Sequence, residues 1–321
     1  MTGKDAMNSN PVLRSEPLVT VVMNCFNGEA YLREAIDSVY NQTYGNWEIV
    51  FWDNASTDGS AGIARSYDRR LRYFRGDETI PLGAARNKAV EQARGDYIAL
   101  LDVDDIWLPG KLEKHVHAME GTDFALCYAG IINIDGSGNI IGSYIPTYPS
   151  GNLFDYLLRQ FDINVPAAMI RKSALKASKL NFDPTIVASE EYCLFMQLAA
   201  AYPFCVIREP VAKYRIHEGA LTNRSIHKWA DEREYTLNRI RENHPGIEGR
   251  YRAAFREAYA RAHYYRARWH VHKGEKLKAI RELRKIIFVH YRYLALFLIL
   301  LMPTPVWDWV HRTRTQRSAF N

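Results

Sequence analysis

The first hundred residues of this chain alternate short apolar runs with segments of helical spacing, and this alternation constrains the fold more than any other feature. The run at 18–23 is apolar at nearly every position, which is typical of a strand buried on both faces. Further runs at 47–52, 71–74 and 97–101 are separated by helical patterns over 31–40, 58–67 and 84–94. This order predicts an α/β fold with a mostly parallel, Rossmann-like central sheet.

Polar clusters follow three of these predicted strands at the point where each strand ends. They are Asn24–Gly28, Asp53–Asp58 and Asp102–Asp105. Because ligands of such sheets bind at the edge where the carboxyl ends of the strands meet, the three clusters together predict a ligand site. Any one of them alone could be a loop that only caps a helix.

The second half of the chain is less regular. A hairpin is predicted from strands over 124–134 and 139–144, joined by a turn at 135–138. Helical patterns occupy 152–161 and 189–202, and a strand over 206–216 is expected to break at Pro210. After residue 221 the pattern is almost entirely helical, with a helical hairpin over 258–287 that turns at 273–275.

Charge divides the chain into two unequal parts. The formal net charge is +6, but residues 1–220 carry −6 and residues 221–321 carry +12. Such a basic region suits an anionic partner, either nucleic acid or a membrane surface. The apolar fraction of 47% excludes wholesale disorder and a multi-span membrane protein. The four cysteines are scattered without a CxxC pair, so we expect reduced cysteines in a cytoplasmic protein rather than a zinc knuckle or a disulfide scaffold.

Carboxylates concentrate after the fourth apolar run. Asp102, Asp104 and Asp105 lie within four positions and would repel one another if nothing neutralised them. Mg²⁺ or Mn²⁺ is the natural partner of such a group, and these ions usually also keep phosphate oxygens as ligands. The same residues are compatible with a solvated turn that caps the next helix.

The other candidate side chains each have a functional and a structural interpretation. Asp53 could accept hydrogen bonds from a nucleobase or a ribose, or could cap its own turn. Phe26 could stack on a base or lie in the core. Arg86, at the start of a helix, could hold a diphosphate or form a surface salt bridge.

Two further candidates lie later in the chain. Glu190 and Glu191 begin a helix behind Ser189, a position that suits acidic residues in any helix, but a carboxylate there could also act as a general base. His217 could ligate a metal or contact phosphate, although an isolated histidine is more often polar surface.

The order of these motifs resembles the family-2 nucleotide-sugar glycosyltransferases, which have the A-type glycosyltransferase fold. The resemblance covers roughly residues 17–225, and its separately weak motifs form a specific ordered set. They are Val19–Val22 followed by Asn27–Glu29, Ser38–Thr43, Asp53–Gly59, Gly83–Asn87, Leu101–Asp105, Glu190–Tyr192 and Tyr214–His217.

The resemblance implies a donor site at the predicted sheet edge. Asp53 would bind the base of the donor nucleotide and Phe26 would stack on it. The other residues that it places on the donor side are Asn24, Asn27, Glu29, Arg86, Asp102 and Asp104.

The resemblance also implies a metal site and a catalytic base. Asp102 and Asp104 would be the Asp-x-Asp pair that holds Mn²⁺ or Mg²⁺ on the donor diphosphate, with His217 as a further metal ligand. Glu191 stands where the family usually has the Asp of a Glu-Asp pair, its catalytic base. Because glutamate is longer by one methylene, Glu190 is the alternative base.

The function implied is that of a metal-dependent inverting hexosyltransferase. It would move a sugar from a nucleotide-diphosphate donor, with UDP as the expected nucleotide, to a carbohydrate or lipid-linked acceptor in bacterial cell-surface polysaccharide or glycolipid synthesis. Residues 17–221 would be the catalytic domain, after a disordered start at 1–16.

Three other functions are compatible with parts of the sequence. The first is a nucleotide-sugar-binding protein without transfer activity, since Glu191 departs from the family pattern. A sugar nucleotidyltransferase is disfavoured because Asn24–Glu29 has one glycine and no basic residue, and nucleic-acid binding is disfavoured because the basic region carries no known motif.

The basic helical region 222–321 predicts attachment to a membrane surface. Its apolar segment, 286–302, ends in ten unbroken apolar residues, whereas a spanning helix needs about 20. Tryptophan and arginine follow at Trp307, Trp309, Arg312, Arg314 and Arg317, a composition that suits a lipid interface. We therefore expect a cytoplasmic enzyme that is peripheral on the inner face of the cell membrane, the alternative being a helix packed on the catalytic domain.

Overall fold

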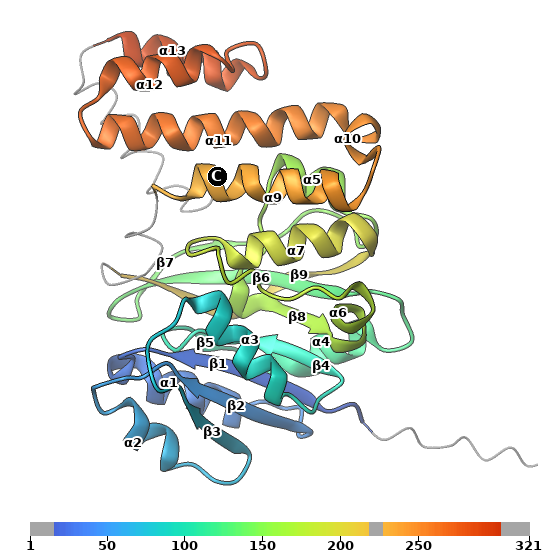
Figure 1. Cartoon of the computed structure of the whole chain (residues 1–321). Coiled ribbons are helices and arrows are strands. Elements are labelled where there is room, and N and C mark those ends of the chain that lie inside the picture. Colours follow the sequence, from blue (N-terminus) through green and yellow to red (C-terminus); the bar gives the residue numbers. More distant parts are fainter. Residues whose placement is uncertain (1–15, 218–226, 303–321) are drawn as a thin grey trace, which may run out of the picture.

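The computed structural model describes residues 16–217 and 227–302, which form a stack of layers with the sheet at one end and helices at the other (Figure 1). Three expectations lie outside these residues: the disordered start apart from residue 16, the boundary at 221–222, and the tryptophans and arginines beyond residue 302.

The described strands form one nine-stranded sheet in the order β3-β2-β1-β4-β8-β6-β9-β5, with β7 paired to β6. Their bounds are β1 (Val19–Cys25), β2 (Trp47–Asp53), β3 (Leu71–Arg75), β4 (Tyr97–Leu100), β5 (Ile106–Trp107), β6 (Leu126–Asp135), β7 (Ile140–Tyr144), β8 (Ala168–Arg171) and β9 (Phe204–Ile216). The four strands β1 to β4 are mutually parallel, as the sequence predicts. β8 pairs antiparallel with both β4 and β6, so the whole sheet is mixed.

Helices cover both faces of the sheet (Figure 1). Their bounds are α1 (Glu29–Tyr40), α2 (Ser60–Arg65), α3 (Leu82–Gln92), α4 (Lys111–Met119), α5 (Phe154–Arg159), α6 (Lys172–Ser178), α7 (Glu190–Ala201), α9 (Trp229–Asn243), α10 (Ile247–Arg250), α11 (Arg252–His272), α12 (Lys276–Arg284) and α13 (Tyr291–Leu301), with a 3₁₀ turn η1 at Val165–Ala167. One buried cluster packs α1 and α4 on the sheet, and another packs α3, α5, α7, α9 and α11 on its other face. A third joins α11, α12 and α13. Within the described ranges, no helix is both long and apolar enough to cross a bilayer.

The prediction that Pro210 breaks the last strand is wrong, because β9 continues through it. The pairing of β6 with β9 shifts register where Gly130 faces Pro210, so the irregularity absorbs a residue that cannot donate to the ladder. A Cβ atom on Gly130 would lie 2.7 Å from the carbonyl oxygen of Tyr144, which explains the glycine. The predicted hairpins at 135–138 and 273–275 are confirmed, as β6–β7 and as the α11–α12 connection.

Candidate active site

The carboxyl ends of β1, β2 and β4 meet at one edge of the sheet. Cys25 pairs with Asp53, and Val22 pairs with Leu100. The loop after β2 is tied to β1 by a hydrogen bond from the Asn54 amide to the Cys25 carbonyl, over 2.7 Å. The three polar clusters therefore lie on neighbouring loops.

Arg86 in α3 joins two groups of site residues that are far apart in the sequence. Its guanidinium is only 3% exposed and donates to Asp102 Oδ1 over 2.8 Å and to Glu190 Oε1 over 2.5 Å. Burial alone would lower its pKa, but the carboxylates of Asp102 and Glu190 raise the pKa of Arg86 above its ordinary value. The arginine is thus a permanent buried cation that fixes the loop after β4 to the start of α7.

Glu190 and Glu191 occupy the first turn of α7, where the helix dipole favours carboxylates. Among the described residues Glu191 has no ion-pair partner, whereas Glu190 is paired with Arg86. Burial, and secondly repulsion from Glu190, raises the pKa of Glu191 to about 8. A carboxylate with a pKa near the working pH is suited to accept a proton.

Asp104 and His217 meet on the loops after β4 and β9, with His217 Nε2 at 2.9 Å from Asp104 Oδ2. Burial and the nearby charge of Asp102 raise the pKa of Asp104 above its ordinary value. Asp105, adjacent in the chain, is buried and accepts a hydrogen bond from the Arg215 amide over 2.8 Å.

Arg215 is a site residue to which the sequence analysis assigned no role. Its buried guanidinium donates to the Asp104 carbonyl over 2.9 Å, pairs with Glu34 over 2.6 Å and lies 4.3 Å from the ring centre of Tyr31. It therefore ties the loop after β4 to α1 and to the strand that leads to His217. The one signal for it was its place in the Tyr214–His217 motif.

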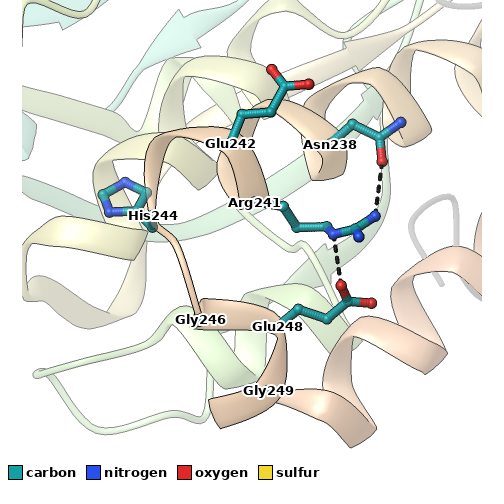
Figure 2. A pocket seen from close by; sticks show the side chains of 7 residues that line it. All are labelled: Asn238, Arg241, Glu242, His244, Gly246, Glu248 and Gly249. Carbon is teal, nitrogen blue, oxygen red and sulfur yellow. Dashed lines mark hydrogen bonds and ion pairs between the residues drawn. The ribbon is translucent and has the colours of Figure 1, made fainter.

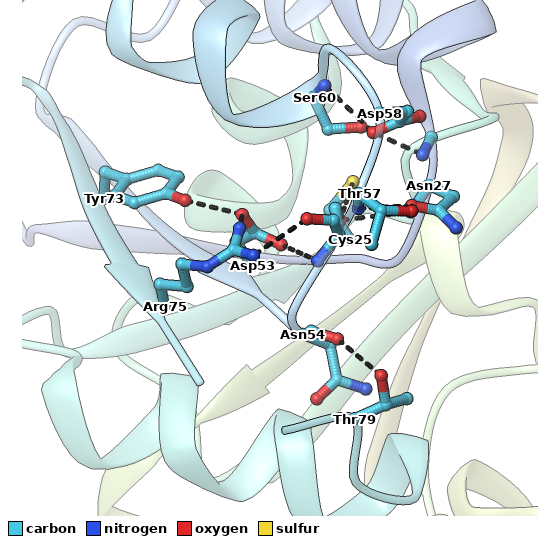
Figure 3. A network of polar contacts seen from close by, with 12 residues as sticks. Cys25, Asn27, Asp53, Asn54, Thr57, Asp58, Ser60, Tyr73, Arg75 and Thr79 are labelled. Atoms are coloured by element: carbon cyan, nitrogen blue, oxygen red, sulfur yellow. Dashed lines mark hydrogen bonds and ion pairs between the residues drawn. The ribbon is translucent and has the colours of Figure 1, made fainter. Parts of the chain in front are cut away.

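Asp53 lies at the centre of a polar network on the loop after β2 (Figure 3). Its fully buried carboxylate accepts hydrogen bonds from the Tyr73 hydroxyl and from Arg75, each over 2.5 Å, and from the Ser56 amide over 2.7 Å. Burial alone would raise its pKa, but these donors, with Tyr73 first, hold the pKa of Asp53 below its ordinary value. The more exposed partner of Asp53 is Arg75, at 40%, a residue that the sequence did not single out.

Asn27 and Glu29 connect two loops of the edge. Asn27 Oδ1 accepts from the Thr57 amide over 2.8 Å, and Glu29 Oε2 accepts from the Gly59 amide over 2.8 Å. Asn27 has a positive φ of 53°, which an asparagine tolerates better than most residues. The donor-side residues predicted here thus have their side chains in loop-to-loop hydrogen bonds.

The two remaining candidates at this edge differ in exposure. The Phe26 ring is 53% exposed at the end of β1, a position open to stacking. Asn24 Nδ2 is buried and donates to no atom of the described residues.

The side chains on the loop after β4, which we call the carboxylate loop, fit a hard divalent cation together with His217. Asp102 and Asp104 offer oxygens and His217 offers a nitrogen. Burial, and secondly repulsion from Asp102, raises the pKa of Asp104, and a cation would relieve that repulsion. Within residues 16–217 and 227–302, no group of three or more His, Cys, Asp or Glu side chains is placed to hold a metal ion, so Asp102, Asp104 and His217 do not together form such a group. An ion held by the two carboxylates would have to take its other ligands from phosphate and water.

The pocket shown in Figure 2 lies away from this edge, where α9 ends and α10 begins. It is lined by Asn238, Arg241, Glu242, His244, Gly246, Glu248 and Gly249, and Arg241 pairs with Glu248 over 2.6 Å. The other end of α9 approaches the site, since Glu232 accepts from the Ser189 hydroxyl over 2.8 Å. The pocket therefore belongs to the helical layers and not to the sheet edge where β1, β2 and β4 end.

Comparison with known sequences gives consistent matches. The sequence model described as Glycosyl transferase family 2 matches residues 20–178. An uncharacterized glycosyltransferase of Methanocaldococcus jannaschii is 36% identical over 63% of this chain and 71% of its own length. A putative teichuronic acid biosynthesis glycosyltransferase of Bacillus subtilis, TuaG, is 28% identical over 67% and 84%. The Escherichia coli UDP-Glc:alpha-D-GlcNAc-diphosphoundecaprenol beta-1,3-glucosyltransferase WfgD is 27% identical over 64% and 80%.

Solved structures resemble the chain over nearly its whole length. S. aureus TarS 1-349 in complex with UDP-GlcNAc has a TM-score of 0.66 at 18% identity, covering 94% of this chain and 92% of TarS 1-349. A mannosyltransferase from Pyrobaculum calidifontis in complex with GDP-Man and Mn²⁺ has a TM-score of 0.61 at 18% identity, covering 95% and 85%. At these identities the likeness establishes the fold alone, and it includes the helical C-terminal layers.

Proposed function

Since this chain belongs to glycosyl transferase family 2 and has the A-type glycosyltransferase fold, we propose that it transfers a sugar from a nucleotide-diphosphate donor to an acceptor hydroxyl with inversion. UDP is the expected nucleotide. The transfer would take place at the edge formed by the carboxyl ends of β1, β2 and β4.

The observation that carries this proposal is the buried guanidinium of Arg86 between Asp102 and Glu190. Asp102 belongs to the motif that would face the donor diphosphate, and Glu190 precedes the candidate base Glu191. The arginine holds the two groups at a fixed separation. Fixed placement of reacting partners is itself a large part of catalysis.

In the proposed mechanism Glu191 accepts the proton of the acceptor hydroxyl as its oxygen attacks the anomeric carbon. Attack occurs from the face opposite the departing diphosphate, so the configuration inverts, and the sugar passes through an oxocarbenium-like state. Phe26 would stack on the base. Asp102, Asp104 and His217 would hold Mn²⁺ or Mg²⁺, which neutralises charge on the leaving diphosphate when bound.

The acceptor class that we propose is a carbohydrate or a lipid-linked sugar of bacterial cell-surface polysaccharide or glycolipid synthesis. It is supported by the printed names of two relatives, one for teichuronic acid biosynthesis and one for a diphosphoundecaprenol-linked acceptor. The Mn²⁺ named for the mannosyltransferase neighbour supports the choice of metal.

A donor panel tests the proposal. Melting temperatures would be measured with nucleotide sugars of different bases and sugars, each with Mn²⁺ and with EDTA. A ligand that binds only the folded state raises the melting temperature by mass action, so at least one UDP-sugar should do so, and only with the metal. A panel without any shift, or a shift that EDTA leaves unchanged, would refute the metal-dependent donor site.

We also propose that the enzyme is peripheral on the inner face of the cell membrane, through the outermost helix α13. Five large apolar residues of α13 and its C-cap, which we call the α13 face, are each at least 42% exposed, next to the exposed Arg292: Tyr291, Leu294, Leu298, Leu301 and Met302. Residues 276–302 also carry six cations and one carboxylate. An exposed apolar face beside cations suits the interface of an anionic membrane.

Sedimentation with vesicles of phosphatidylglycerol and phosphatidylcholine tests this attachment. The double variant Leu294→Glu/Leu298→Glu should lose most of the binding seen for the parent at low salt, because two charges would enter the apolar interface. Ile140→Glu/Ile141→Glu is the matched control, since these two exposed residues of β7 lie outside α13. Equal sedimentation of all three proteins, or none by the parent, would refute attachment through the α13 face.

A further inference from the structure

Arg233 of α9 is a buried cation without an acidic partner among the described residues. It is 6% exposed, and its Nη1 donates to no atom in the described part of the chain. Its guanidinium carbon lies 4.2 Å from the ring centre of Tyr192 and 5.7 Å from that of Tyr265. Aromatic faces offset only part of the cost of burying a cation, so the arrangement suits an additional anion.

Two other buried hydrogen-bond donors lie beside Arg233. Trp229 Nε1 and the Tyr192 hydroxyl are buried and form no hydrogen bond with the described residues. Trp229 lies one helical turn before Arg233, on the same side of α9. The centre of its ring lies 5.4 Å from the centre of the Tyr265 ring. Arginine and indole nitrogens can only donate, so the group that would satisfy them is an acceptor with several oxygens.

The carboxylates nearest to Arg233 in the sequence are bound elsewhere. Asp231 and Glu234 pair with Arg266 over 2.7 and 2.6 Å. Glu232 accepts hydrogen bonds from the segment before α7, including the Ser189 hydroxyl. The local acids therefore leave the charge of Arg233 uncompensated.

A second arginine makes the same place more positive. Arg261 of α11 lies near the phenols of Tyr265, Tyr293 and Tyr192, which raise its pKa although burial opposes them. Burial would raise the pKa of Tyr265, but Arg233 and Arg261 hold it below its ordinary value. Arg261 donates to the Arg159 carbonyl over 2.6 Å, and no carboxylate of the described residues pairs with it.

The position of this cluster relates it to the acceptor. Tyr192 directly follows Glu191, and α7, α9 and α11 are successive layers on the side of the site away from β1 to β3 (Figure 1). Asp102 and the donor-side loops lie at the sheet edge instead. An anion bound beside Tyr192 would thus belong to the molecule whose hydroxyl Glu191 activates.

We propose that Arg233, Arg261, Trp229, Tyr192 and Tyr265, which we call the Arg233 cluster, bind a phosphate group carried by the acceptor. Guanidinium groups bind phosphate oxygens strongly, with two hydrogen bonds in a fixed geometry. This inference rests on the proposed function and adds to it a substrate class: acceptors in which a phosphate ester lies close to the sugar that is extended.

The first test uses inorganic diphosphate as a probe, with EDTA present and NaCl at equal ionic strength as the reference. Diphosphate should raise the melting temperature of the parent, and Arg233→Met should lose most of that rise, because methionine keeps the packing on the two rings but removes the charge. Arg233→Lys, which keeps the charge, should retain part of it. Arg241→Met is the matched control: it removes an exposed, ion-paired arginine of the same helix and should respond like the parent.

The second test compares two acceptors that differ only in the phosphate, a sugar diphosphate ester and the methyl glycoside of the same sugar. Arg233→Met should raise KM about 10–100-fold for the phosphorylated acceptor, the range expected for a lost hydrogen bond to a charged group, and leave KM for the methyl glycoside and the donor unchanged. Equal effects on both acceptors would make Arg233 structural, and a diphosphate shift without a KM effect would make the cluster a free-anion site. Either result overturns the proposal. Absence of all transfer by the parent would instead count against the proposed function, while the melting test would still decide anion binding.

Discussion

Glu191→Gln is expected to slow sugar transfer by about 10²–10⁴-fold, the usual contribution of a positioned base, while donor binding stays intact. The amide cannot accept the proton of the acceptor hydroxyl, but it has the size of the carboxyl group and leaves the pair of Arg86 with Glu190 in place. Transfer rates and the affinity for UDP, measured by calorimetry, separate the two effects.

Glu190→Gln is the natural comparison for this variant. It removes one of the two carboxylates that hold the buried Arg86, so it should weaken donor binding and lower the melting temperature, which Glu191→Gln should not do. If only Glu190→Gln loses transfer with donor binding preserved, the base is Glu190. Full activity in both variants would contradict a catalytic role for the pair.

The pH dependence of kcat/KM should follow the titration of Glu191. Only the ionised carboxylate accepts a proton, so kcat/KM should rise with pH up to about 8 and then level off. Because repulsion from Glu190 contributes to the raised pKa, the rise should move to lower pH in Glu190→Gln. A profile that is flat across neutral pH would contradict the assignment of Glu191 as the base.

Asp104→Ala is expected to abolish metal-dependent binding of UDP, with a loss of at least about 10–100-fold, the range seen even for residues that only support a metal ligand. The pKa of Asp104 is raised by burial and by Asp102, so its charge destabilises the fold near neutral pH, and its removal should not lower the melting temperature. Calorimetry with Mn²⁺ and UDP measures the affinity.

Asp123→Ala is the control for Asp104→Ala. Asp123 is exposed and precedes β6, at the opposite end of that strand from Asp135 and the site. The Asp123→Ala variant should bind UDP and Mn²⁺ with the same affinity as the parent protein. Unchanged metal-dependent affinity in Asp104→Ala would show that the carboxylate loop does not hold the metal.

The parallel half of the sheet could be predicted because strands buried on both faces are continuous apolar runs, as in β1 and β2. The antiparallel half could not. β5 has two residues and β8 has four, too few to show a period, and they are strands only because β9, β4 and β6 lie beside them. The break predicted at Pro210 is wrong because the strand accommodates a proline where Gly130 of the neighbouring strand faces it, and Gly130 is distant in the sequence.

The candidate residues could be listed from the order of motifs, but their contacts could not. Arg86 was a candidate for the diphosphate, and nothing local indicates that Glu190 would reach it from the other half of the chain. Asp53 was a candidate for the base, and the side chains that cover it, Tyr73 and Arg75, come from a neighbouring strand. The surroundings of Arg233 could not be predicted either, because the rings it packs on, Tyr192 and Tyr265, belong to two other helices.

The anomeric configuration of the product distinguishes inverting transfer from transfer with retention. The parent enzyme would be given Mn²⁺, an acceptor and the α-linked UDP-sugar that raises its melting temperature most, and the product would be examined by proton NMR. We expect the parent to form a β-linked product, and Glu191→Gln to form much less of it. An α-linked product, or a β-linked product formed equally fast by Glu191→Gln, would contradict inverting transfer with Glu191 as the base.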